Sequence, residues 1–136
     1  MKLIKARTLI KGVGEGEALV STKPISFYGG VDPKRGIVVE KGHPLEGVSL
    51  KGRVLFFPYG KGSTVSSYVI YELARRGFAP RAIVNLESEL IIIAGCALAS
   101  IPLVDKPSPN PFNLVKDGDY VKVVAIGKVA KVLIGG

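Results

Sequence analysis

The chain has 136 residues, of which 47% are hydrophobic and 22% are charged, and this balance predicts one folded domain over residues 1–136 rather than a disordered protein. No apolar run approaches the roughly 20 residues that a membrane-spanning helix needs, and the N-terminus lacks the apolar core of a secretion signal. We therefore expect no membrane partner. A single cysteine excludes an internal disulfide, so we also expect a cytoplasmic protein.

The net charge of +8 comes from basic residues that are scattered along the chain, with no run of five or more. Proteins that bind nucleic acids usually gather basic residues into a patch with interleaved aromatic residues, so we expect no nucleic-acid partner. A plain basic surface, an anionic substrate and an acidic partner protein all remain open.

The N-terminal part of the chain predicts strands joined by glycine-rich turns. Residues 2–10 alternate charged and apolar side chains, as a half-buried strand does. Residues 12–17 predict a hairpin turn, and residues 18–21 predict the returning strand. The turn matches the dinucleotide pattern G-x-G-x-x-G only loosely, because Glu17 stands where the last glycine belongs.

Residues 26–36 predict a long loop, because Gly29-Gly30 and Asp32-Pro33 both interrupt regular structure. A loop of this length in a compact domain is usually functional or mobile. The backbone N–H groups of Gly29 and Gly30 could bind a carboxylate, and a plain crossover loop is the alternative. Residues 37–39 predict a short strand. His43 is the single histidine, and since Pro44 follows it we expect a turn there and no all-histidine metal site.

The middle of the chain predicts a buried strand at residues 53–57, followed by two glycines, a lysine and a cluster of hydroxyl side chains. Gly60 and Gly62 permit a positive φ, and Ser63 or Thr64 is a natural N-cap for the helix that follows. That helix would direct its free N–H groups and its positive dipole end at the loop, which predicts an anion pocket with Ser63 at its mouth. A well-capped turn without a ligand is the alternative.

Two standard patterns fail at this loop. The phosphate-binding pattern G-x-x-x-x-G-K-[ST] would need glycine at Phe57 and lysine at Ser63, and the nucleophile-elbow pattern G-x-S-x-G would need glycine at Val65. A standard nucleotide site and a standard hydrolase are therefore excluded. The helix should end at Gly77 and bury one apolar face, formed by Val65, Tyr68, Val69 and Leu73.

The second half of the chain predicts further short elements. Residues 53–86 form a candidate right-handed βαβ unit that ends in a strand at 82–86. Residues 90–100 could form a strand or a buried helix, and their small residues favour a tightly packed short helix in which Cys96 is a buried, inert thiol. The remaining predicted elements are a strand at 101–104, a stiff loop with three prolines at 105–111, a turn at 117–119, and a hairpin made of 120–126 and 129–134.

Strands, a βαβ core and further strands predict an α/β protein. Its expected architecture is an open β-barrel or two packed sheets, flanked by about two helices. No internal repeat interrupts this order.

Several of these stretches resemble one family. The sequences FYGGVDP at 27–33, HPLEG at 43–47 and GKGS at 60–63 occur in the order and spacing of the small, swivel-type subunit of aconitase X proteins, and ELARRGFAP at 72–80 extends the match. The resemblance runs from about residue 26 to residue 104. It implies a swivelling β/β/α domain that docks on a large catalytic subunit as a heterodimer.

The resemblance also implies a function. It implies a hydro-lyase, active only with its large subunit, that dehydrates the phosphorylated hydroxy acid (R)-5-phosphomevalonate to trans-anhydromevalonate 5-phosphate in the archaeal modified mevalonate route to isoprenoids. It assigns a 4Fe–4S cluster to the large subunit, so no metal ligand is expected in this chain. The catalytic serine of the family, a proton acceptor, falls on Ser63. The expected substrate-binding residues are Gly29, Gly30, Asp32, Lys61 and Gly62.

The chemistry of these residues agrees with that implication. Elimination of water from a hydroxy acid needs a base for the α-proton and a Lewis acid for the leaving hydroxyl. A serine becomes a plausible base only in a positive potential, which the helix N-terminus, the loop amides and Lys61 supply in part. The family often has arginine at position 61. Lys61 keeps the positive charge but cannot bind a phosphate or carboxylate through two parallel hydrogen bonds, as arginine does. Another hydroxy acid, such as hydroxyproline or an aconitate-like acid, and a non-catalytic anion-binding module are the alternatives. In each case residues 26–36 should lie beside residues 60–63.

Overall fold

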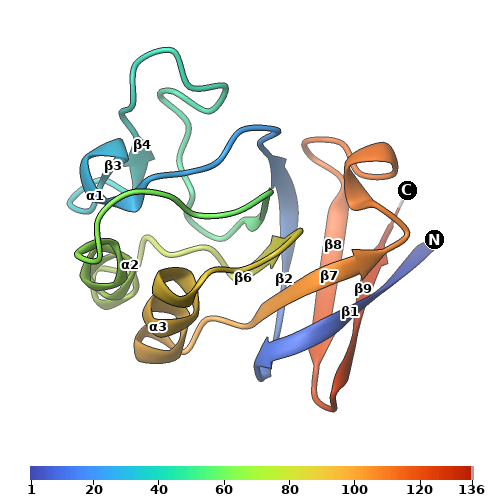
Figure 1. The fold of residues 1–136 in the computed structure, drawn as a ribbon. Coiled ribbons are helices and arrows are strands. Elements are labelled where there is room, and N and C mark those ends of the chain that lie inside the picture. The colour runs from blue at the N-terminus through green and yellow to red at the C-terminus, as the bar shows by residue number, and fades with distance from the viewer. Residues whose placement is uncertain (136) are drawn as a thin grey trace.

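The computed structural model describes residues 1–135, and its main element is a closed barrel of seven strands in the order β1-β7-β6-β5-β2-β8-β9 (Figure 1). The first strand lies between β7 and β9, which closes the barrel. The predicted α/β class is confirmed, and of the two expected architectures the structure has a barrel, which is closed rather than open. The strands are β1 (Lys2–Ile10), β2 (Gly12–Val20), β5 (Val54–Phe57), β6 (Ala82–Asn85), β7 (Leu103–Ser108), β8 (Tyr120–Ala125) and β9 (Val129–Ile134).

The remaining elements lie outside the barrel. A short turn of helix, α1 (Phe27–Gly30), leads into a small two-stranded sheet, β3 (Val31–Asp32) and β4 (Ile37–Val38). Two longer helices, α2 (Ser66–Arg75) and α3 (Leu90–Ala99), pack side by side next to the barrel (Figure 1). A single 3-10 turn occupies Pro111–Asn113. No helix in the part of the chain that the structure describes is long and apolar enough to cross a membrane.

The strand β5 is buried on both sides, as its apolar sequence predicted. Val54 and Phe56 belong to the apolar cluster that fills the barrel, whereas Leu55 and Phe57 belong to the cluster between the barrel and the helices. β5 pairs in parallel with β6, which confirms the predicted β5-α2-β6 unit. A second unit, β6-α3-β7, also pairs in parallel, and both helices therefore cover the same side of the barrel wall.

The hairpin turn predicted at residues 12–17 is wrong, because these residues lie inside the continuous strand β2. Gly14 and Gly16 do not reverse the chain; they allow the backbone of neighbouring segments to approach β2 closely. A Cβ on Gly14 would overlap the carbonyl oxygen of Arg81, and a Cβ on Gly16 would overlap that of Gly52. The chain reverses at Lys11 instead, between β1 and β2.

Two other predictions need correction. The stiff loop expected at 105–111 is wrong for its first half, because β7 continues to Ser108 and pairs with β1 there. Of the predicted apolar face of α2, Val69 and Leu73 are buried, but Val65 and Tyr68 are exposed. Ile70 is buried in their place, since α3 approaches closely where Gly95 packs against its side chain. The predicted strands β1 and β6, the helix α3 and the β8–β9 hairpin are confirmed.

Candidate active-site loop

The candidate site lies at the carboxyl ends of the parallel strands β5 and β6, which is where ligands commonly bind in parallel sheets. Residues 58–65 connect β5 to α2, and the segment that begins at Ile25 runs alongside them. Lys61 N donates a hydrogen bond to Ile25 O at 3.0 Å, and Ile25 and Gly60 form a parallel bridge. The expected adjacency of the two glycine-rich segments is therefore confirmed at their starts, where Ile25 and Ser26 lie along Gly60–Gly62.

Gly62 makes this adjacency possible. Its φ of +97° lies in the left-handed region, and a Cβ on it would come within 2.5 Å of Ser26 Oγ. Any larger residue would therefore strain the backbone at this φ and displace the hydroxyl of Ser26.

Ser63 is exposed on this loop, close to the start of α2. Its Oγ accepts a hydrogen bond from Val65 N at 3.2 Å, and its carbonyl accepts one from Ser66 N at 3.0 Å. The prediction that Ser63 or Thr64 is the N-cap is wrong by position, because the helix begins at Ser66 and Val65 takes the cap position. Ser63 instead forms a serine turn just ahead of the helix, with its hydroxyl facing solvent.

Lys61 and Gly30 both contact the acidic residue Glu40. Lys61 Nζ lies 3.8 Å from Glu40 Oε2, and the side chain of Lys61 is half exposed. Glu40 N in turn donates a hydrogen bond to Gly30 O at 3.2 Å. A surface pair at this distance is weak, so the lysine is free to exchange Glu40 for an anionic ligand.

Gly29 is exposed at the tip of α1 with a φ of +84°, and no atom lies within 4 Å of the position that a Cβ would take. Asp32 lies elsewhere. Its carboxylate accepts hydrogen bonds from Arg35 Nε at 2.7 Å and from Lys34 N at 2.9 Å, within the β3–β4 turn. The Arg35 hydrogen bond lowers the pKa of Asp32 below its usual value. The structure thus links Gly30 to Lys61 through Glu40 and places Gly62 against Ser26, next to Ser63 in the chain. Gly29 lies exposed at the tip of its own turn, and the carboxylate of Asp32 is held in the β3–β4 turn.

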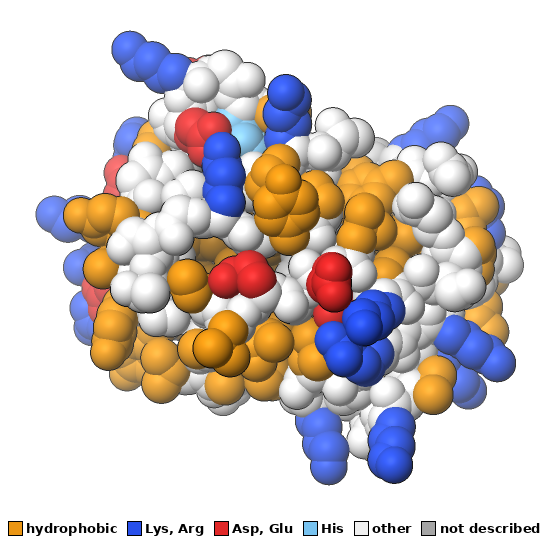
Figure 2. All heavy atoms as spheres, viewed as in Figure 1, with side chains coloured by type: hydrophobic (Ala, Val, Ile, Leu, Met, Phe, Trp, Pro, Cys, Tyr) orange, Lys and Arg blue, Asp and Glu red, His pale blue; other side chains and the backbone are white. Residues whose placement is uncertain are grey.

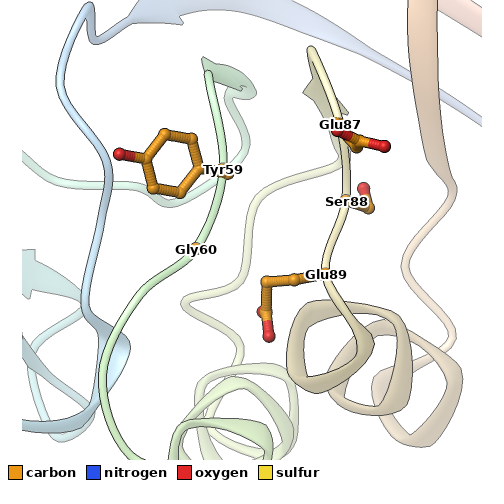
Figure 3. A pocket seen from close by; sticks show the side chains of 5 residues that line it. All are labelled: Tyr59, Gly60, Glu87, Ser88 and Glu89. Atoms are coloured by element: carbon orange, nitrogen blue, oxygen red, sulfur yellow. The ribbon is translucent and has the colours of Figure 1, made fainter.

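A cavity that the sequence analysis missed lies next to this loop. It has a volume of about 440 Å³ and is lined by Tyr59, Gly60, Glu87, Ser88 and Glu89 (Figure 3). Glu89 caps α3, since its carboxylate accepts hydrogen bonds from Ile91 N and Ile92 N at 3.0 and 2.9 Å. Two carboxylates line the cavity and Ser63 does not, so an anionic ligand of Ser63 would lie outside it.

A buried polar network supports the wall of this cavity. Asp105 is fully buried, and Arg7 Nε and Nη2 each donate a hydrogen bond to its carboxylate at 2.9 Å. Ser88 N donates to the same carboxylate at 3.0 Å. Asn85, also fully buried, donates to Phe57 O at 2.9 Å and so ties the ends of β5 and β6 together. Hydrogen bonds to buried groups therefore hold the strand ends below the Ser63 loop, whereas Ser63 itself is exposed.

A family model of the aconitase X swivel domain matches residues 3–132 of this chain. The chain belongs to the aconitase X swivel-domain family. The crystal structure of aconitase X from Thermococcus kodakaraensis in its holo form superimposes on this swivel domain with a TM-score of 0.90 and 42% identity, covering 98% of this chain and 99% of that one.

Two curated relatives are similar to this chain in sequence over most of its length. The small subunit of phosphomevalonate dehydratase from Methanosarcina acetivorans is 56% identical over 120 residues, which cover 88% of this chain and 83% of the relative. The protein of the same name from Thermococcus onnurineus is 49% identical over 125 residues, covering 92% and 93%. The family resemblance that the sequence motifs indicated is therefore confirmed.

The residues of this swivel domain do not fit a 4Fe–4S cluster, which is usually held by four cysteine thiolates. Cys96 is the only cysteine of the chain, and it is fully buried in the cluster between the barrel and the helices. Burial raises the pKa of its thiol to about 12, so the thiolate that a metal needs is strongly disfavoured. Among residues 1–135, no three His, Cys, Asp or Glu side chains lie close enough together to hold a metal ion.

We predict that Cys96 does not react with a disulfide reagent at pH 8 in the folded protein and reacts fully after unfolding. Its thiol is enclosed, and at a pKa of about 12 roughly one molecule in 10⁴ carries the thiolate at that pH. The measurement is the rate of colour release in buffer and in denaturant. Leu98→Cys is a matched control, because position 98 lies on the same helix and is 53% exposed. Equal rates for positions 96 and 98 in buffer would contradict the burial of Cys96.

Proposed function

We propose that this swivel domain is the small subunit of an archaeal phosphomevalonate dehydratase, a hydro-lyase that works in the cytoplasm in the modified mevalonate route to isoprenoids. The observation that carries the proposal is the 56% and 49% identity to subunits of that name over almost the whole chain. The substrate is then (R)-5-phosphomevalonate, and the product is trans-anhydromevalonate 5-phosphate.

In this proposal Ser63 acts as the alkoxide, and its Oγ accepts the proton from C2 of the substrate and later returns it to solvent. The electron pair of the C2–H bond forms the C2=C3 double bond, the C3–O bond breaks with its electron pair on oxygen, and the leaving hydroxide takes up a proton from solvent to become water. Three features of the loop support this role. Ser63 is exposed, its hydroxyl accepts only a 3.2 Å hydrogen bond, and it lies beside the positive end of α2. Lys61, two residues away, adds a positive charge that favours an oxyanion at Ser63.

The same geometry supports roles in binding for the neighbouring residues. Lys61 is the charged group nearest in sequence to Ser63, and we assign it to a phosphate or carboxylate of the substrate. The backbone N–H groups of the two exposed glycines, Gly29 and Gly62, are proposed as further anion contacts, whereas Gly30 is buried behind them. We leave Asp32 out of this group, because Arg35 and Lys34 already occupy its carboxylate.

A large subunit is part of the proposal, since Ser63 lies on an open surface and the chain fits no cluster ligands. We propose that this partner carries the 4Fe–4S cluster and covers the Ser63 loop as a heterodimer. The surface of α3 supports a protein partner. The helix contains no charged residue, and Leu90 and Leu98 are 78% and 53% exposed. Figure 2 shows apolar side chains gathered over α2 and α3 on this face of the molecule.

We predict that the purified chain alone is inactive and that activity is restored by adding a large subunit of the same family with its cluster. The assay follows the loss of phosphomevalonate and the appearance of the alkene proton by NMR. Hydroxyproline and citrate are tested in parallel, because conversion of either one in place of phosphomevalonate would support the corresponding alternative substrate. Turnover by the chain free of iron and partner would contradict the two-subunit proposal, and a complex that turns over none of these acids would contradict the function.

A further inference from the structure

We propose that Ser66 is a positioning residue, whose buried hydroxyl fixes the Phe27–Gly30 turn against the Ser63 loop. The proposal deepens the proposed function and rests on it, because the turn carries Gly29, which is assigned to the substrate. Ser66 acts through the backbone of Tyr28 and does not touch the substrate itself.

The turn has a conformation that needs support. Tyr28 has φ −77° and ψ 117°, and Gly29 has φ 84° and ψ −22°. These are the angles of a type II β-turn at its two central positions. Rotation of the peptide between Tyr28 and Gly29 would convert it into a type I turn and reverse the direction of the Gly29 N–H. An exposed glycine at the tip does not prevent that rotation, since nothing lies within 4 Å of its Cβ position.

Two serine hydroxyls hold the turn in its observed form. Ser26 Oγ donates a hydrogen bond to Tyr28 O at 3.0 Å, and Tyr28 N donates one to Ser66 Oγ at 3.1 Å. In a trans peptide the C=O and the next N–H point in opposite directions, so a fixed Tyr28 carbonyl also fixes the direction of the Gly29 N–H. The Ser66 bond fixes the peptide on the other side of Tyr28.

Ser66 connects two segments that are far apart in the sequence. It is the first residue of α2 and lies three positions after Ser63, whereas Tyr28 is 38 positions away. Its side chain is only 1% exposed, so it cannot reach a ligand on the surface. The Ile25–Lys61 hydrogen bond ties the same two segments at the other end of the contact. Ser66 therefore sets the distance between this turn and the Ser63 loop, whereas Ser26 fixes the direction of the Gly29 N–H.

Ser66→Ala removes the acceptor of the Tyr28 N–H and leaves Ser63 in place. In the reconstituted complex we expect KM for phosphomevalonate to rise about 3- to 10-fold, the equivalent of one lost hydrogen bond, with a smaller change in kcat. Ser66→Cys keeps the shape of the side chain with a weaker acceptor, and its KM should rise in the same direction. Ser67→Ala is the matched control, because Ser67 is also buried at 9% exposure but its Oγ donates to Thr64 O within the loop.

Hydrogen exchange provides a readout that does not depend on activity. In the complex, the amide of Tyr28 should exchange about 10-fold faster in Ser66→Ala than in the wild type or in Ser67→Ala, because only the first change removes its partner. Unchanged exchange at Tyr28, or the same KM in Ser66→Ala and Ser67→Ala, would overturn the proposal. A wild-type complex without dehydratase activity would instead contradict the proposed function, and the exchange rates would still decide whether Ser66 holds the turn.

Discussion

Replacement of Ser63 by alanine is expected to lower turnover in the reconstituted complex by about 10²–10⁴-fold, which is the usual effect of losing a positioned base. The fold should tolerate the change. The side chain is exposed and makes one hydrogen bond, to Val65 N at 3.2 Å, so its removal should cost no more than about 1 kcal/mol of stability. Melting temperature and kcat measured on the same sample separate the two effects.

Thr64→Ala is the control for the Ser63 variant, because Thr64 is the next residue of the same exposed turn. It should keep wild-type turnover within a small factor. Wild-type activity in Ser63→Ala would refute the assignment of the base. Equal losses at positions 63 and 64 would show that the turn acts only through its backbone shape.

The second large effect is structural. Gly14→Ala should destabilise the domain by on the order of 3 kcal/mol or more, because the new Cβ would overlap the carbonyl oxygen of Arg81. The carbonyl of Arg81 cannot move away easily. It belongs to the residue that leads into β6, and Arg81 N is hydrogen-bonded to Arg53 O at 2.8 Å. A loss of this size is a large part of the stability of a domain, and urea unfolding measures it.

Gly127→Ala is the matched control for Gly14→Ala. Gly127 lies in the turn between β8 and β9, and nothing is found within 4 Å of its Cβ position. Its replacement should leave the urea midpoint almost unchanged. A Gly14→Ala protein as stable as the wild type would mean that the barrel wall can move at Arg81, contrary to the tight contact described above.

The strands of the barrel wall were predictable where the sequence alternates. β1, β8 and β9 each present one side to the filled barrel, so polar and apolar residues alternate along them and their limits were found within one residue. The strand β2 was not predicted, because its three glycines are typical of a turn. Only Arg81 and Gly52, which are distant in the sequence, show that the glycines make room for other backbone.

The candidate site was predictable in part for the same reason. The Ser63 loop could be recognised from the local sequence, because its glycines and hydroxyl residues are close to one another in the chain. Asp32 was assigned to the substrate by the family resemblance, but in the structure its carboxylate accepts a hydrogen bond from Arg35 within the β3–β4 turn. The cavity wall at residues 87–89 and its support by Asp105 were missed, since no local pattern connects segments that meet only through the order of the strands.

The position of β1 in the barrel has a consequence for the synthesis of the protein. β1 pairs with β7 on one side and with β9 on the other, from Lys2 opposite Ile134 to Arg7 opposite Val129. During synthesis β1 therefore finds both of its neighbours only after β9 has been made, on the order of 10 s later at typical rates of about 5–20 residues per second. Until then β1 and β2 expose unpaired edges on the nascent chain. The barrel is thus expected to close only after β9 emerges, and its vulnerable period is the time before that.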